Sequence, residues 1–227
     1  MQHFTLCLFV ALLAVHPCMA GDAPATPPAV VVVFQNLCVQ CHGAKGEGKA
    51  EVKSPSIASL PAWYVQRQLE NFQQDKRGAH PQDVEGQMMR AMAKTLNPEQ
   101  TRDIARLVEK MPRVEPAPTI VADTAQGQEL FADRCMECHR FNGEGEIVFG
   151  SAPLVGLQDW YLASQLRKFK DGRRGAEKND ANGQKMVHVT ASFIEGEEMI
   201  QSVSAYIMKL QQKPAPNASG DVVFGRE

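Results

Sequence analysis

The sequence lacks the patterns of a β-sheet protein or of a protein embedded in a membrane. No segment of the 227 residues alternates apolar and polar side chains as a half-buried strand does, so the pattern favours an all-α fold. The apolar run 30–33 is far shorter than the roughly 20 residues that a membrane-crossing helix needs. The formal net charge of −2 gives no indication of nucleic-acid binding.

Spare cysteines are also lacking. Two of the six cysteines, Cys7 and Cys18, fall within residues 1–20, where an apolar stretch (4–15) and a small Ala20 predict a signal peptide cleaved after Ala20. Residues 1–3 contain no Lys or Arg, which leaves an uncleaved anchor as the alternative. The other four cysteines all belong to two Cys-x-x-Cys-His motifs, so none is left for a disulfide.

The two motifs, 38–42 and 135–139, predict two covalently attached haems. At this spacing both thiols can form thioether bonds to the vinyl groups of one haem, while the adjacent His is placed beneath the iron. The predicted attachment residues are therefore Cys38 and Cys41 for one haem c and Cys135 and Cys138 for the other. The predicted proximal iron ligands are His42 and His139.

A zinc site is the competing interpretation, because two Cys-x-x-Cys pairs could close one four-thiolate site. Three features favour haem instead. Each pair is followed directly by His, each follows an apolar helical pattern, and the copies lie 97 residues apart, from Cys38 to Cys135, which is far more than in a zinc ribbon.

The offset of 97 extends well beyond the cysteines and predicts two homologous domains. Matching residues recur around Trp63 and Trp160, around Phe72 and Phe169, and at Arg77-Gly78-Ala79 and 174–176. A unit of this length can fold by itself around a cofactor, so the repeat indicates tandem domains and not a solenoid. Each unit would be marginal on apolar burial alone, and a haem supplies the missing core.

The same offset selects the second iron ligand. Met88, Met89 and Met92 fall in one stretch, and only Met89 has a methionine, Met186, at the equivalent position. We therefore expect Met89 and Met186 to be the distal ligands, although methionine is a common core residue. The core interpretation fits four other methionines better: Met92, Met111, Met199 and Met208.

The expected domain boundaries follow from these patterns. They are a signal peptide (1–20), a first domain (29–112), a stiff proline-containing linker (113–124), a second domain (125–210) and a flexible tail (211–227). Asn97, Pro98 and Gln100 predict the start of the last helix of the first domain, because they form a capping box with Pro at the first helical position.

The chain resembles the diheme class I cytochromes c, and the cytochrome c4 family in particular. The resemblance spans about 29–210 and rests on the following residues: Cys38, Cys41, His42, Gly43, Pro55, Trp63, Tyr64, Gln68, Leu69, Phe72, Met89 and Leu96, with Cys135, Cys138, His139, Pro153, Trp160, Tyr161, Gln165, Leu166, Phe169 and Met186. Arg140, in place of a Gly, and Phe193-Ile194, in place of a Leu, depart from the family pattern.

This resemblance implies two tandem class I cytochrome c domains, each wrapped around one haem. It also implies that the carbonyl groups of Pro55 and Pro153 accept hydrogen bonds from the proximal His rings, an arrangement that sets ring orientation and basicity. Arg77 and Arg174 recur at the offset and are candidates to pair with haem propionates, a surface role being the alternative.

The resemblance and the His/Met ligation together predict a function. Such an iron has no open position for oxygen or peroxide, so it passes single electrons. We expect a periplasmic electron carrier, not an enzyme, that works between respiratory donors and a terminal oxidase or reductase. The alternatives are a bound cytochrome subunit of a haem-copper oxidase, with peripheral membrane association through that complex, and a diheme peroxidase. Residues 35–112 carry 11 basic and 9 acidic residues, and 125–213 carry 11 and 12, which suits the first domain to an acidic partner.

Overall fold

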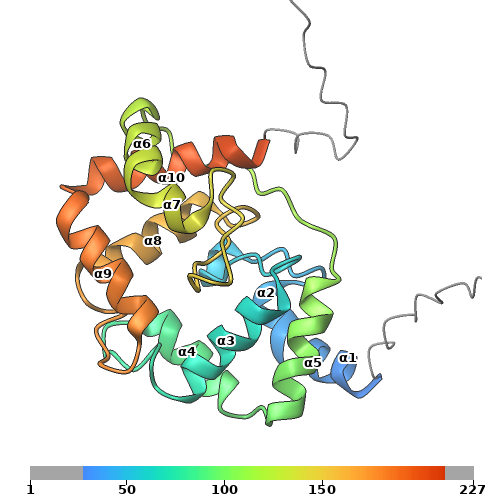
Figure 1. Ribbon diagram of the computed structural model, residues 1–227. Helices are drawn as coiled ribbons and strands as arrows, with labels where there is room; N and C mark the ends of the chain where they lie inside the picture. Colours follow the sequence, from blue (N-terminus) through green and yellow to red (C-terminus); the bar gives the residue numbers. More distant parts are fainter. Residues whose placement is uncertain (1–27, 213–227) are drawn as a thin grey trace, which may run out of the picture.

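The computed structural model describes residues 28–212 (Figure 1). The predicted signal peptide (1–20) and nearly all of the predicted tail lie outside the described residues. Within 28–212 the chain is helical, and its β-structure is limited to two isolated bridges, Lys49 to Ser54 and Glu146 to Ser151. The all-α prediction is confirmed. No helix of this part of the chain is both long enough and apolar enough to cross a bilayer.

Each half begins with a short helix that is interrupted just before the haem motif. In the first half, α1 (Pro28–Val33) passes through a π-helical turn (Phe34–Cys38) into α2 (Val39–His42). In the second, α6 (Ala125–Leu130) passes through a π-helical turn (Phe131–Cys135) into α7 (Met136–His139). Such turns are rare and often occur at functional sites. Phe34 and Phe131, the first residues of these turns, are buried. The first cysteine of each motif ends the turn, and the rest of the motif forms the next helical segment.

Three further helices complete each half. They are α3 (Ala62–Gln73), α4 (Val84–Ala93) and α5 (Pro98–Glu109) in the first, and α8 (Asp159–Lys170), α9 (Ala181–Phe193) and α10 (Glu197–Gln212) in the second. The predicted capping box begins α5, where the side chains of Asn97 and Gln100 each accept a hydrogen bond from the other's backbone N–H group. The last helix, α10, extends two residues into the predicted tail, because Gln211 hydrogen-bonds the backbone of Gly156 and Leu157.

The helices pack around one core that includes residues of both halves. Helix α3 lies on α4 and α5, while α10 lies on α6 and α8. Phe34, Phe72 and Val108 of the first half belong to the same buried cluster as Phe131 and Val203 of the second. The two domains therefore share apolar contacts as well as polar ones.

The segment between the halves, 113–124, contains no helix and is fixed to the second half by a buried carboxylate. Asp159, at the start of α8, is fully buried and accepts hydrogen bonds from the backbone N–H groups of Thr119 and Ile120 at 2.6 and 2.7 Å. In Figure 1 this segment runs along the outside of the molecule from α5 to α6. The hydrogen bonds hold the segment against the domain that follows it.

One core assignment from the sequence is wrong. Met92 is 37% exposed on α4, whereas Met208 is buried and Met111 packs against the core. Met92 lies one turn after Met88, and both fall on the solvent side of a short amphipathic helix. Sequence spacing alone did not distinguish that side from the core side.

Candidate haem sites

Both motif histidines are buried and held in one tautomer by a backbone carbonyl group. The Nδ1 atom of His42 lies 2.8 Å from the carbonyl oxygen of Pro55, and that of His139 lies 2.8 Å from the carbonyl oxygen of Ala152. Because a carbonyl oxygen only accepts hydrogen bonds, each Nδ1 carries the ring proton and donates the hydrogen bond. The Nε2 atom of each ring is therefore bare, which is the form that binds a metal.

The second carbonyl corrects the assignment from the sequence. Pro153 was expected to be the acceptor for His139, but the acceptor is Ala152, the residue before it. Ala152 lies at the repeat offset of 97 from Pro55, whereas Pro153 lies one residue further. A carbonyl acceptor does not require proline, so the position in the repeat decides, and the residue type does not.

Burial keeps these rings neutral. Removal from water lowers the pKa of His42 and of His139 below the ordinary histidine value, against the opposing effect of the hydrogen bond to the carbonyl group. A neutral imidazole has a lone pair available at neutral pH. The two histidines are therefore ready to coordinate iron without first losing a proton.

No disulfide joins any two of the four described cysteines. All four described cysteines are free and partly buried. Burial, with a smaller contribution from the neighbouring cysteine, raises the pKa of Cys38 to about 11 and that of Cys135 to about 12. Within 28–212, no three His, Cys, Asp or Glu side chains converge on a point where they could hold a metal ion. The two pairs thus do not form the four-thiolate zinc site that was the alternative.

A mainly apolar cavity adjoins the motif of the second half. It is lined by Cys135, Cys138 and His139 and also by Met186 on α9, with Leu154, Leu162 and Leu166 among its apolar walls. This combination suits a porphyrin, because the walls are apolar, the thiols can attach its edge, and a nitrogen and a sulfur ligand face the same space. A haem bound here would supply reversible one-electron chemistry at its iron.

In the first half, the exposure of the three neighbouring methionines separates them. Met88 and Met92 are 51% and 37% exposed, whereas Met89 is partly buried and packs against the core cluster, as Cys38 does. Of the three, Met89 therefore has its side chain on the inner side of α4. This arrangement supports the pair Met89 and Met186 without testing ligation itself.

The two Arg-Gly repeats take part in the contact between the halves. Arg77 donates to the Tyr161 hydroxyl at 2.9 Å and to Gln165 at 3.2 Å, and Arg174 donates to Gln68 at 3.2 Å. Each guanidinium also lies over a phenylalanine of its own half, Phe72 or Phe169. Both arginines line the cavity described above, so neither has the surface role that the sequence left open.

The glycines of these repeats are required by close packing. Gly78 and Gly175 both have positive φ, at 75° and 80°, and an added Cβ would come within 2.2 Å of the Gly86 carbonyl oxygen and 2.5 Å of the Gly183 carbonyl oxygen. Only glycine fits both the conformation and the space. This contact places each Arg-Gly turn against the first turn of the methionine-bearing helix.

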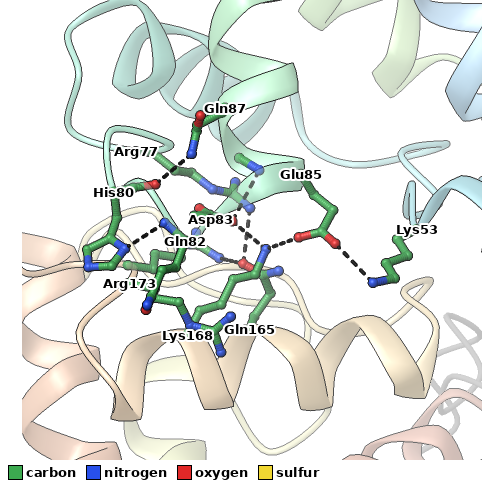
Figure 2. A network of polar contacts seen from close by, with 12 residues as sticks. Lys53, Arg77, His80, Gln82, Asp83, Glu85, Gln87, Gln165, Lys168 and Arg173 are labelled. Carbon is green, nitrogen blue, oxygen red and sulfur yellow. Dashed lines mark hydrogen bonds and ion pairs between the residues drawn. The ribbon is translucent and has the colours of Figure 1, made fainter.

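A buried ion pair that the sequence did not indicate crosses the interface (Figure 2). Lys168 of α8 is 5% exposed along its side chain and binds Asp83, the N-cap of α4, and Glu85 at 2.9 Å. Glu85 also binds Lys53 at 3.3 Å. The hydrogen bond from Lys168, the largest cause, lowers the pKa of Glu85 to about 2. No repeat could have revealed this group, because the residue equivalent to Lys168 is Asn71.

Comparison with known proteins adds to this geometry. The family model for cytochrome c matches the chain twice, over residues 30–112 and 124–211. A thiosulfate dehydrogenase electron acceptor of Stutzerimonas stutzeri is 27% identical, with 93% of this chain and 96% of that protein covered. The crystal structure of reduced cytochrome c4 from Pseudomonas stutzeri aligns with a TM-score of 0.60 at 28% identity, covering 79% of this chain and 96% of that one.

A third relative is matched over part of its length. A Cbb3-type cytochrome c oxidase subunit FixP of Bradyrhizobium sp. is 31% identical over 63% of this chain and 50% of that protein. This chain thus spans about half of that subunit.

Proposed function

We propose an electron-transfer role for this chain, which belongs to the cytochrome c family as a diheme protein of the cytochrome c4 type and binds two haem c groups. It carries single electrons outside the cytoplasm from a respiratory donor to a terminal oxidase or reductase. One observation carries the proposal. Both halves present a buried, Nδ1-protonated histidine together with an inward-facing methionine at matched positions. Iron with both ligands is saturated, and such an iron exchanges electrons without binding a substrate.

The donor we favour is an enzyme that oxidises thiosulfate. This choice is supported by the relative described as a thiosulfate dehydrogenase electron acceptor, since the alignment covers nearly all of both chains. The loop after the first haem motif bears three exposed lysines, Lys45, Lys49 and Lys53, which suit an acidic docking surface on a partner. The equivalent loop of the second half has none of these charges and exposes Ile147, Val148 and Phe149 instead.

Stopped-flow spectroscopy tests this proposal. The oxidised two-haem protein is mixed with a thiosulfate dehydrogenase and thiosulfate, and haem reduction is followed at the α-band. We expect reduction only when enzyme and thiosulfate are both present, followed by reoxidation when membranes that contain a terminal oxidase are added. The triple variant with Lys45, Lys49 and Lys53 changed to Gln is expected to react more slowly at low salt. Haem reduction that is equally fast without the enzyme would contradict the proposed donor. Haem reoxidation that is equally fast without the membranes would contradict the proposed acceptor.

Two other functions make different predictions. A permanently bound oxidase subunit would co-purify with the oxidase from membranes, and a partial match to FixP supports that alternative over only half of the subunit. A diheme peroxidase would turn over peroxide after half-reduction, which requires one iron to lose its distal ligand. The matched positions of Met89 and Met186 favour the carrier over the peroxidase, and native mass analysis and a peroxide assay separate all three.

A further inference from the structure

The outer face of α4 carries a line of exposed apolar side chains. Val84, Met88 and Met92 are 60%, 51% and 37% exposed. Their spacing of four residues places them on one side of the helix, about one turn apart. Single exposed apolar side chains are ordinary on a protein surface, but a row of neighbouring ones marks a candidate contact surface. We call Val84, Met88 and Met92 the α4 stripe.

The fold does not require this stripe, because the second half folds without it. The residues of α9 at the offset of 97 are Ala181, Lys185 and Val189. An exposed lysine thus stands where the first half has Met88, and Val189 lines the cavity of the second half. Both helices nevertheless begin at a capping aspartate. The apolar side chain of Met88 therefore serves something other than the formation or packing of α4.

The polar side chains of α4 are all engaged by other residues of the chain. They are Glu85, which binds Lys53 and Lys168 (Figure 2), Gln87, which donates to the carbonyl oxygens of His80 and Pro81, and Arg90, which binds Asp75. Each charged side chain of this helix therefore has an opposite charge beside it. A partner surface that is complementary to the α4 stripe is apolar and carries no excess charge.

The helix that carries the stripe is held rigidly and lies over a proposed iron ligand. Its N-cap, Asp83, binds Lys168 and accepts from the Gly86 N–H group at 3.1 Å. A surface that is already ordered loses little conformational entropy when a partner binds. Met89 follows Met88 in the chain and lies on the inner side of α4. Only this helix would therefore separate a partner on the stripe from the proposed ligand, and a short separation favours electron transfer.

The extent of the α4 stripe suits a short-lived complex. Stable complexes bury about 800 Å² on each partner, whereas electron-transfer complexes lie at the low end, below about 1,200 Å² in total. Three partly exposed side chains cover only a fraction of the larger area. Methionine also adapts to different surfaces, because its side chain is flexible and polarisable. These features fit a redox protein that docks briefly better than a second copy of this chain that stays bound.

We propose that the α4 stripe is the docking surface for the electron acceptor, a redox protein that presents an apolar patch without excess charge. The inference rests on the proposed electron-carrier function and adds the chemistry of the acceptor to it. The donor and the acceptor then dock at different surfaces, the donor at the loop with Lys45, Lys49 and Lys53. Because ion pairs contribute little at the stripe, the acceptor reaction should change little with salt, whereas the donor reaction should slow as salt rises.

Reoxidation by membranes tests the inference. The full-length two-haem protein is reduced with ascorbate, the ascorbate is removed, and oxidation by membranes that contain a terminal oxidase is followed at the α-band. Met88→Gln should lower the second-order rate constant about tenfold, because an amide replaces the central apolar contact. Met88→Leu should retain most of the rate. Val148→Gln is the matched control, since Val148 is 83% exposed on the second half, and it should react like the wild type. All three variants should keep two haems and the far-red band.

A wild-type rate in Met88→Gln would overturn the proposal. If Met88→Gln holds fewer than two haems, Met88→Lys decides in the same way, because lysine is the residue at the equivalent position in α9.

The other occupants of the stripe are tested without an oxidase. A wild-type dimer in analytical ultracentrifugation that Met88→Gln dissociates would show a second copy on the stripe and overturn the proposal. Binding to phosphatidylethanolamine and phosphatidylglycerol vesicles that Met88→Gln abolishes would show a lipid surface and do the same. If the membranes do not reoxidise even the wild-type protein, the proposed function fails and the inference falls with it. Reoxidation of wild type and Met88→Gln at one rate removes the inference alone.

Discussion

At the start of α4 in the first half, a corner is formed by Lys53 and Glu85 together with Lys168, which comes from the second half. The equivalent corner at the start of α9 has Gly150 and Asn182, with Asn71 from the first half. The residues proposed to hold the haem iron do not differ in this way. The cysteines, the histidines, the carbonyl acceptors, the inward methionines and the Arg-Gly turns all recur at the offset of 97. The comparison teaches that the repeat preserves the proposed haem-binding residues, while the residues around each proposed haem site give the two sites different charge.

The largest effect is expected from the distal ligands. Met89→Ala and Met186→Ala should each abolish the weak far-red band of one oxidised haem and lower its potential by roughly 0.1 V or more, because the methionine ligand stabilises reduced iron. Met88→Ala and Met92→Ala are the matched controls, since both side chains are exposed, and they should retain the band. Loss of the band in either control with retention in Met89→Ala would refute the assignment in the first half.

The buried ion pair is expected to come next. Lys168→Met leaves Asp83, which is 2% exposed, without its cation and should reduce the free energy of unfolding by about 3–5 kcal/mol. The equivalent change in the other half, Asn71→Met, removes no ion pair and should cost less than about 1 kcal/mol. Denaturant unfolding measures both, and Asp83→Asn added to Lys168→Met should recover part of the loss. Equal costs for Lys168→Met and Asn71→Met would mean that the two corners do not differ as described.

The close-packed glycines follow. Gly78→Ala and Gly175→Ala combine a positive φ with overlap on a backbone carbonyl and should each cost about 2–4 kcal/mol. Gly172 also has a positive φ, 76°, but nothing lies within 4 Å of an added Cβ. Gly172→Ala should therefore cost only about 1 kcal/mol. If thermal unfolding gives the three variants the same loss, the backbone contact with Gly86 or Gly183 contributes nothing.

The smallest effect concerns pH. Lys168, by hydrogen bonding, lowers the pKa of Glu85 from 4.5 to about 2, so the folded state binds this proton less readily than the unfolded state. The resulting stability is present above pH 4.5 and is lost as the pH falls towards 2. Because solvent reaches this carboxylate, we expect about 1 kcal/mol. Glu85→Gln should flatten the unfolding free energy over this range relative to the wild type. An unchanged slope in the variant would remove Glu85 from the account.

The sequence predicted most of the parts that recur in the two halves and missed those that act across the interface. The offset selected Met89 over Met88 and Met92 and located the Arg-Gly turns, because a repeated position is under the same geometric demand in both halves. It would also have selected Ala152 over Pro153 had position been preferred to residue type. The π-helical turns before the motifs carry no periodic signal. Lys168 could not be found in this way, since it acts across the interface and its equivalent, Asn71, is uncharged.

The central claim is that both halves hold a saturated haem and that the chain works by passing single electrons. The direct test is a reductive titration of the purified full-length protein, combined with a pyridine haemochrome assay on the denatured chain and with carbon monoxide addition to the reduced form. We expect two haems that remain attached in denaturant, uptake of two electrons per chain in separate one-electron steps, and only slow binding of carbon monoxide at either iron. A single haem per chain, or one iron that binds carbon monoxide rapidly, would contradict the account.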